Sequence, residues 1–164
     1  MDSLEKPAIS TIEVFLPVKL TIAWIGKTKS AAIQSLTDEY LKRLKRFAEV
    51  EGVSLKDDAA LLKAAGRDSR AVRRHLVLLD FRGKQLSSEE LAQFIRTHQD
   101  RNPQPLVFAI GPADGFSENA RNHGDFVLSL GKMTIAHELA RVMLLEQLYR
   151  AFTILKGHPY HLGH

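Results

Sequence analysis

The chain ends in KGHPYHLGH, where His158, His161 and His164 stand three residues apart and Tyr160 lies between them. Imidazole can bind metals, exchange protons near neutral pH and contact nucleobases, so this tail could do several kinds of chemistry. No carboxylate accompanies the histidines in the sequence, and the chain has no cysteine. We therefore favour contact with a substrate over a metal site. A tail without a chemical role is the alternative.

Three other patterns exclude common classes of enzyme. Gly26-Lys27-Thr28 resembles the end of a phosphate-binding P-loop, but Thr21 occupies the position of the first glycine. No G-x-G-x-x-G fingerprint of a dinucleotide-binding fold is present. Ser117 and Ser129 lack the G-x-S-x-G turn of a serine hydrolase. A nucleotide triphosphatase, a Rossmann-type dehydrogenase and a serine hydrolase are therefore not indicated.

Two loops have compositions that suit a ligand. Gly111–Gly115 (GPADG) follows an apolar run directly, where glycine allows a ligand to approach the backbone closely. Leu130–Ala136 (LGKMTIA) is half apolar, although a loop of this kind usually carries polar turn residues. It could line a pocket for a flat, partly apolar ligand such as adenine. A structural turn, with Met133 and Ile135 packed in the core, is the alternative.

The composition is that of one basic globular domain. The chain has 164 residues and a net charge of +4, and 45% of its residues are apolar. The basic balance favours a polyanionic partner, and nucleic acid comes before membrane because no apolar run is long enough to span a bilayer. Residues 1–17 do not resemble a signal peptide, so we expect a short N-terminal extension and a cytoplasmic protein.

Hydrophobic patterns predict strands alternating with helices. Apolar, β-prone runs predict strands at 18–25, 75–80, 106–110 and 125–130, and a weaker one near 50–56. Helical spacing follows at 33–47, Ser87 and Glu90 form a capping box for the next helix, and a short helical turn is expected at 117–123. The polar segment 57–74 is expected to be helical and to lie outside the core. Such alternation predicts an α/β fold, a parallel sheet with helices on both faces and ligands at the carboxyl ends of the strands.

The predicted last helix, 137–155, is apolar on almost every side. One sheet face covers only one side of a helix, so a subunit interface is the simplest further cover. We expect Leu145 and Leu148 to lie in that interface. A helix wrapped by its own domain is the alternative.

The motifs together resemble a known family. LSLGKMTIAHELARVMLLEQLYRAFTILKGHPYH is similar to the C-terminal part of the ribosomal large-subunit methyltransferase H family of the SPOUT superfamily. The pieces IAWIGK, DEYLKRL, HLVLLDFRGKQLSSEELA and LVFAIGPADGFS fit it too. The resemblance extends from about residue 20 to 161, and EQLYRA followed by HPYH is its most specific part.

This resemblance implies a fold and an activity. It implies one SPOUT domain over residues 18–164 with a C-terminal trefoil knot, a feature that is rare among proteins. It implies a homodimer that uses S-adenosyl-L-methionine to methylate N3 of a pseudouridine in a large-subunit ribosomal RNA hairpin at the ribosomal subunit interface. Carried over position by position, the cofactor site comprises Leu79, Gly111, Leu130, Gly131, Lys132, Met133, Thr134 and Ile135.

The same resemblance assigns the catalytic side to the tail. His161 is expected to accept the N3 proton, and Tyr160 to stack on the base or bond to it. Arg141 is expected to stabilise an oxygen anion or to hold a phosphate. We expect RNA to bind the basic helix face of residues 42–46 and the arginines of segment 67–74.

Two departures from the family leave a second function open. The family usually has two glycines where this chain has Gly111-Pro112, and proline has no N–H to offer a cofactor. The family commonly ends with a basic residue soon after Tyr-His, whereas Leu162-Gly163-His164 follow here. The alternative function is a non-catalytic RNA-binding or ribosome-associated module of the same fold.

Overall fold

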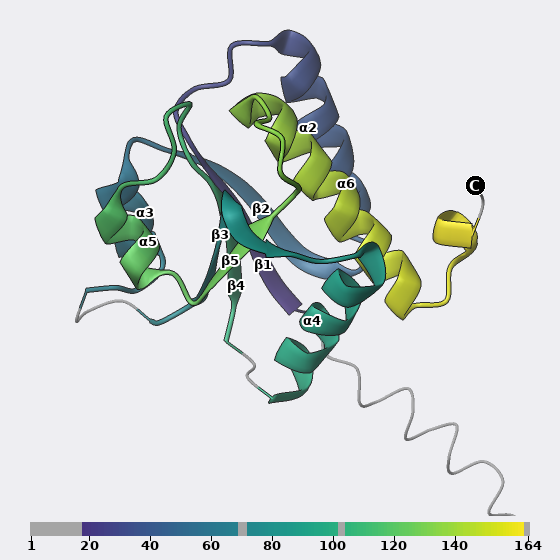
Figure 1. Cartoon of the computed structure of the whole chain (residues 1–164). Coiled ribbons are helices and arrows are strands. Elements are labelled where there is room, and N and C mark those ends of the chain that lie inside the picture. The colour runs from purple at the N-terminus through teal and green to yellow at the C-terminus, as the bar shows by residue number, and fades with distance from the viewer. Residues whose placement is uncertain (1–17, 69–71, 102–103, 163–164) are drawn as a thin grey trace, which may run out of the picture.

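The computed structural model describes residues 18–68, 72–101 and 104–162. Within them, five strands form one sheet in the order β2-β1-β4-β3-β5, and all neighbouring strands are parallel. The strands are β1 (Val18–Ile25), β2 (Ala48–Leu55), β3 (His75–Gln85), β4 (Leu106–Ile110) and β5 (Phe126–Ser129). The α/β prediction is confirmed, and the bounds of β1 and β4 are those that the sequence predicts (Figure 1).

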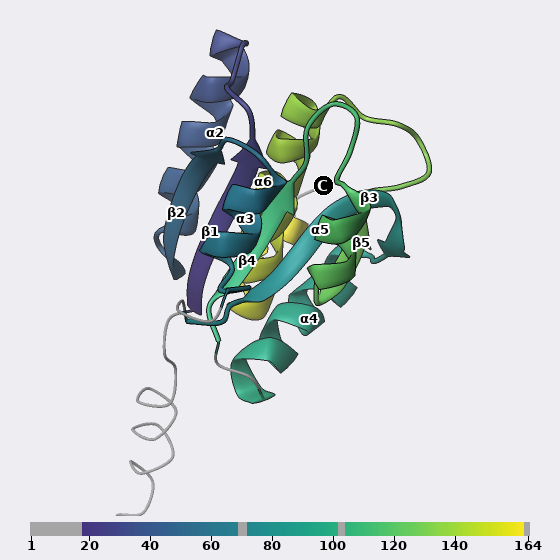
Figure 2. The same cartoon turned by 90° about the vertical axis from the view of Figure 1, so that its left-hand side faces the viewer.

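Helices cover both faces of the sheet (Figure 2). One face packs against α2 (Ala31–Leu44), α4 (Ser88–Arg101) and α6 (His137–Leu155), which share the larger core cluster. The other face packs against the short helices α3 (Asp58–Ala64) and α5 (Glu118–His123). The chain then forms a single 3-10 turn, η2 (Pro159–Leu162).

The strand register brings the candidate loops to one edge. Trp24 pairs with Ile110, Ile110 pairs with Leu79, and Leu79 pairs with Leu128. These four residues form a row across four adjacent strands, at the carboxyl ends of β1, β4 and β5 and directly before the bulge of β3. The loops that follow them therefore open on the same side of the sheet, as in other parallel sheets with ligands at this edge.

β3 is five residues longer than the sequence prediction, which ended at Asp80. Both Leu79 and Lys84 pair with Leu128, so residues 80–83 bulge out of the sheet before the strand rejoins β5. Gly83 makes this return possible, since a Cβ atom there would lie 2.5 Å from the backbone oxygen of Val127. The polar residues of this segment hide the strand in the sequence.

The prediction that segment 57–74 lies outside the core is wrong. Leu61 and Ala65 are fully buried against the sheet, because α3 is amphipathic and presents them inward. The Arg67 side chain is only 5% exposed, and its guanidinium lies 2.6 Å from the Asp125 carboxylate. Arg67 is thus a structural residue, not an RNA contact, and Arg73 pairs with the same carboxylate at 2.6 Å.

The bounds of α6 are confirmed, but its predicted interface residues are not. Leu145 and Leu148 are fully buried within this chain, because α2, α4 and the sheet surround that part of the helix. The apolar side chains that α6 leaves exposed are Leu139 (54%) and Met143 (41%). Leu36 on the neighbouring α2 is 43% exposed.

No helix among the described residues is long and apolar enough to cross a membrane. The expected extension, residues 1–17, lies outside the described residues. The trefoil knot stays a prediction.

Candidate functional site

A cavity of ≈ 250 Å³ opens at the carboxyl edge of the sheet, beside the start of α6. Its walls come from the bulge of β3, from the end of β4 with the loop after it, and from the loop between β5 and α6 with the first turn of α6. Seven of the eight predicted cofactor residues line it: Leu79, Gly111, Leu130, Gly131, Met133, Thr134 and Ile135. Lys132 does not line the cavity. Residues 50 positions apart in the chain thus converge on one pocket.

The bulge of β3 adds a charged rim that the sequence prediction missed. Asp80, Phe81 and Arg82 line the cavity. The Arg82 guanidinium donates to both oxygens of Asp80, at 3.0 and 2.8 Å, and these bonds hold the pKa of Asp80 below its usual range. The rim therefore carries an ionised carboxylate at neutral pH, already paired with its own arginine.

The loop after β4 forms a tight turn in which Pro112 fits. The Pro112 carbonyl accepts a hydrogen bond from the N–H of Gly115 at 2.9 Å, so the proline supplies the acceptor of this turn. A Cβ atom on Gly111 would lie 3.2 Å from the ring of Phe116, which is buried beneath the turn. Gly111 thus allows the turn to lie close to Phe116.

Ser129 fixes the start of the apolar loop. Its hydroxyl accepts from the N–H of Gly131 at 3.0 Å and donates to the carbonyl of the same residue at 2.9 Å. Gly131 has φ 141°, a backbone conformation that residues other than glycine rarely adopt. The loop therefore leaves β5 along a defined path toward α6.

The start of α6 is tied to the start of α2. The Glu138 carboxylate accepts from the backbone N–H groups of Lys29 and Ser30, at 2.9 and 3.2 Å. Both bonds lower the pKa of Glu138, and the bond from the Lys29 N–H has the larger effect. His137 and Ala140, on either side of Glu138, line the cavity, so this contact helps to place one of its walls.

Arg141 lies inside the protein, apart from the tail residues with which the sequence analysis groups it. It is 1% exposed, donates to the Thr37 hydroxyl at 3.2 Å and lies 4.1 Å from the ring centre of Trp24. Burial lowers the pKa of Arg141. In this chain its guanidinium joins α6, α2 and β1 and is shielded from solvent, and its predicted contact with an oxygen anion or a phosphate stays a prediction.

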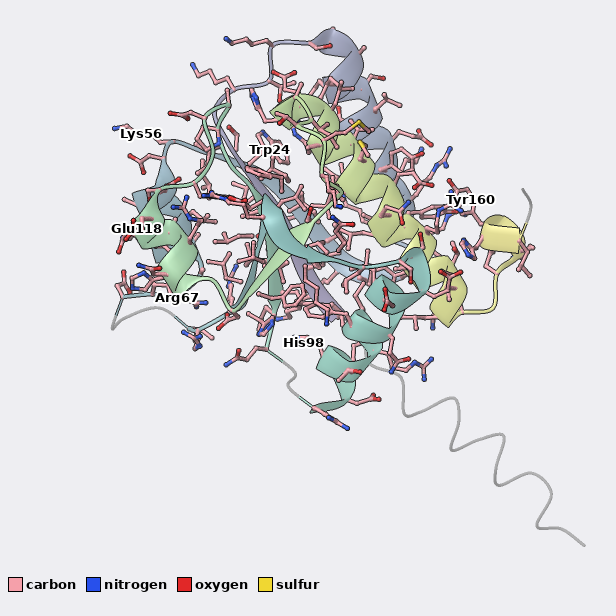
Figure 3. The ribbon with its side chains drawn as sticks, viewed as in Figure 1. Trp24, Lys56, Arg67, His98, Glu118 and Tyr160 are labelled. Carbon is pink, nitrogen blue, oxygen red and sulfur yellow. The ribbon has the colours of Figure 1, made fainter. Side chains whose placement is uncertain are left out.

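Tyr160 is anchored on the last turns of α6. Its hydroxyl donates to the Glu146 carboxylate at 2.8 Å, and its ring packs edge-on against Tyr149. Burial, together with the bond to Glu146, raises the pKa of Tyr160 to about 12. Figure 3 shows the residue beside the C-terminal half of α6.

His161 contacts two charged side chains that the sequence pattern does not predict. An Arg150 N–H points at Nδ1 at 3.1 Å, and Nε2 lies 2.8 Å from the Glu89 carboxylate on α4. Glu146 binds Arg150 at 2.7 Å as well as Tyr160. Glu89 is 72 residues from His161 in sequence, so spacing alone could not have revealed the pair.

Within the described residues, the tail does not line the pocket of its own chain. Ala140 lines the cavity, whereas the tail packs against Glu146 and Arg150. At about 1.5 Å per residue, these positions lie about 9 and 15 Å further along the helix. The structure therefore assembles the predicted cofactor residues and, separately, the pair Tyr160 and His161.

Among the described residues, no three His, Asp or Glu side chains come close enough to hold a metal ion. His164 lies outside those residues. The cavity itself offers apolar walls, backbone groups of two glycine-containing loops and a charged rim, but neither a cysteine nor a serine among its lining residues. This arrangement suits the binding of a flat, partly charged ligand better than covalent catalysis.

Comparisons with known proteins agree with this geometry. Residues 18–161 match a protein-family model described as a predicted SPOUT methyltransferase. The chain is 56% identical over 147 residues to the ribosomal RNA large subunit methyltransferase H of Koribacter versatilis, covering 90% of this chain and 100% of that protein. It is 40% identical over 152 residues to the protein of the same name from Geotalea daltonii, covering 88% and 99%.

Solved structures share the fold at low sequence identity. The SpoU methyltransferase AviRb from Streptomyces viridochromogenes, determined in complex with the cofactor AdoMet, superposes with a TM-score of 0.52 at 14% identity, covering 88% of this chain and 60% of AviRb. A probable methylase family protein from Haemophilus influenzae superposes with a TM-score of 0.54 at 13% identity, covering 87% and 70%.

Proposed function

Because the chain belongs to the SPOUT methyltransferase family, we propose that it transfers a methyl group from S-adenosyl-L-methionine to large-subunit ribosomal RNA. The observation that carries the proposal is the cavity at the carboxyl edge of the sheet. It gathers seven residues that the family resemblance assigns to the cofactor. The names of the relatives supply the class of substrate.

The residues of the cavity fit this cofactor. The apolar side chains of Leu79, Ile110 and Leu130 suit the faces of an adenine ring, and the loop backbones supply hydrogen-bonding groups. The Asp80 carboxylate at the rim has both oxygens paired with Arg82, so it would meet a sulfonium or an amino group only in exchange for one of these bonds. When bound, the cofactor supplies an electrophilic methyl group, and the chain's own work is to hold and orient the reactants.

We propose N3 of a pseudouridine as the atom that receives the methyl group, as the resemblance to the methyltransferase H family implies. This nitrogen carries a proton at neutral pH and must lose it in the reaction. The site therefore has to stabilise the charge that develops on the base. Tyr160 and His161 are the proposed residues on the substrate side.

A homodimer would bring the two halves of the site together. Leu36, Leu139 and Met143 expose apolar surface on α2 and α6, two helices that pack side by side (Figure 1). Large exposed apolar side chains on adjacent helices are typical of a protein interface. Contact through this surface would allow the tail of one protomer to approach the cavity of its partner. A cytoplasmic location would follow from the ribosomal substrate.

The proposal is tested by incubating the purified protein with labelled S-adenosyl-L-methionine and ribosomes that lack the modification. Label in large-subunit RNA that maps to N3 of one pseudouridine would support it. Calorimetric titration with the cofactor, run alongside, separates the alternative function. A folded protein that binds ribosomes but no cofactor would be the non-catalytic module. The missing N–H of Pro112 would then be the first explanation to test.

A further inference from the structure

The side chain of His161 is fixed by charged groups from two helices. Arg150 on α6 points an N–H at Nδ1, and Glu89 on α4 lies against Nε2. The Arg150 guanidinium is itself held by Glu146 at 2.7 Å, and the Tyr160 hydroxyl binds the same carboxylate oxygen. Both nitrogens of the imidazole are therefore engaged within the protein.

These contacts decide which nitrogen carries the proton. A guanidinium has donors and no acceptor, so Nδ1 must accept from Arg150 through its lone pair. An ionised carboxylate only accepts, so Nε2 must donate its proton to Glu89. A doubly protonated ring would place an N–H against the Arg150 N–H at 3.1 Å, which is repulsive. The neutral tautomer with the proton on Nε2 is the one that gives the Arg150 N–H, both ring nitrogens and the Glu89 carboxylate a matching partner.

Glu89 is held in place by the packing of α4 against α6. The neighbouring Ser88 donates a hydrogen bond to the Gln147 side chain at 2.6 Å, and Ser87 and Glu90 form the capping box that starts α4. The Glu89 side chain itself is 65% exposed, whereas that of His161 is 25% exposed. The carboxylate can thus leave the imidazole when a substrate arrives, while the backbone that carries it stays fixed.

We propose that Glu89 is a positioning residue that, with Arg150, delivers His161 to the target base as a hydrogen-bond donor and not as a proton acceptor. This inference rests on the proposed function. The Nε2–H group breaks its hydrogen bond to Glu89 and donates instead to a carbonyl oxygen of the base. Negative charge develops on this oxygen as N3 loses its proton to solvent water. N3 then forms its bond to the methyl carbon as the carbon–sulfur bond breaks, and the sulfonium becomes a neutral thioether. This role replaces that of proton acceptor, for which His161 has no free lone pair.

The first test is the tautomer. Long-range ¹H–¹⁵N NMR spectra of the full-length protein with ¹⁵N-labelled histidine report which ring nitrogen carries the proton, and His161→Gln identifies the signal. We expect the proton on Nε2 at pH values where the ring is neutral. A proton on Nδ1 would overturn the proposal.

The second test is methylation of ribosomes by Glu89 variants. Glu89→Ala should lower kcat/KM for ribosomes about three- to fivefold, the range expected for an exposed ion pair, with unchanged affinity for S-adenosyl-L-methionine. Glu89→Gln should recover most of the activity, because its amide oxygen also accepts from Nε2–H. Asp100→Ala, which removes an exposed carboxylate from the far end of α4, is the matched control and should match the wild type.

The pH profile separates the two roles of His161. A donor requires the Nε2 proton, which both the neutral and the charged ring carry, so kcat of the wild type should show no histidine-like ionisation, whereas a proton acceptor would require the neutral ring and give one. Equal activity of Glu89→Ala and wild type would overturn the role of Glu89. A wild type that binds the cofactor but methylates no ribosome would instead refute the proposed function, so the two failures are distinguishable.

Discussion

At the scale of single residues, partners decide what each functional group can do. Arg141 and Arg150 stand nine residues apart on the same helix, yet one is sealed against Trp24 and the other meets the tail. Both are arginines in an apolar sequence, so residue type alone gave no basis for choosing between them. The choice requires the packing of α2 on α6, which buries the first and leaves the second at the edge.

The pKa of the Tyr160 phenol reports on the surroundings of this side chain. Its pKa is raised from 10.0 to about 12, so the folded state holds the phenol proton more tightly than the unfolded chain does. Burial disfavours the tyrosinate and the bond to Glu146 needs the phenol proton, so the stability that Tyr160 contributes is fully present below pH 10 and is lost as the pH rises through about 12. A difference absorbance titration of wild type against Tyr160→Phe should show one tyrosinate forming near pH 12. Identical titrations above pH 11 would contradict this.

Gly111 tests the cofactor pocket. Gly111→Val would press a branched side chain on the Phe116 ring, already 3.2 Å from the position of Cβ, and so displace a turn that lines the cavity. We expect calorimetry to show at least about fivefold weaker binding of S-adenosyl-L-methionine, since overpacking typically costs about 1–3 kcal/mol. Adding Phe116→Leu, which makes room for the valine, should restore part of the affinity. Full affinity in a folded Gly111→Val protein would place the cofactor elsewhere.

At the scale of elements, local patterns located most helices and strands but not their arrangement. The run from Val18 to Ile25 ends at a glycine, and the run from Leu106 to Ile110 lies between Pro105 and Gly111, so both strands have clear limits. The capping box of Ser87 and Glu90 forms as predicted, with bonds of 2.7 and 3.0 Å. Such signals are local in sequence, and that is why they could be recognised.

What could not be predicted depends on contacts between distant segments. Residues 80–83 of β3 leave the sheet and include polar side chains. The apolar run that predicts the strand therefore ends at Asp80. The burial of Leu61 depends on the sheet beneath α3, and the pairing of Glu89 with His161 depends on α4 meeting the tail. The cofactor residues could be named individually only through the family resemblance, with the compositions of the loops after β4 and β5 as the independent indications.

The return of β3 can be tested at Gly83. A methyl group there would meet the Val127 backbone at 2.5 Å, and backbone cannot rotate aside as a side chain can. Gly83→Ala should therefore destabilise the protein by about 1–3 kcal/mol, seen as a lower Tm by differential scanning calorimetry. Lys84→Ala, a change at the next and exposed position, should leave Tm close to that of the wild type. A Gly83→Ala protein as stable as the wild type would show that β3 does not approach β5 so closely.

At the scale of the whole molecule, the fold separates the two parts of the proposed site. The cavity lies at the start of α6, and the tail lies against its second half. A monomer could not complete the site without moving the tail away from Glu146, Arg150 and Glu89. The exposed Leu139 and Met143 on the same helix offer a simpler solution, in which a second protomer supplies the missing part.

This arrangement predicts that two inactive variants can complement each other. Gly111→Val damages the cavity and keeps the tail, whereas His161→Ala damages the tail and keeps the cavity. Mixed after mild dissociation in equal amounts, they should form hybrid dimers in which one site pairs the intact cavity with the intact tail. Random pairing gives about a quarter of the wild-type activity, because about half of the dimers are hybrids and each hybrid has one intact site out of two.

Two controls make the result decisive. Light scattering should show a dimer for the wild type and a monomer for the double variant Leu139→Glu/Met143→Glu, because paired carboxylates in an apolar contact are costly. Adding this double change to both partners should abolish complementation, although each protein remains folded. If the mixture instead stays as inactive as its components while hybrid dimers are present, then each tail serves the cavity of its own chain. The tail would in that case have to leave α6 during the reaction, and the contacts of His161 with Arg150 and Glu89 would be a resting state that the substrate opens.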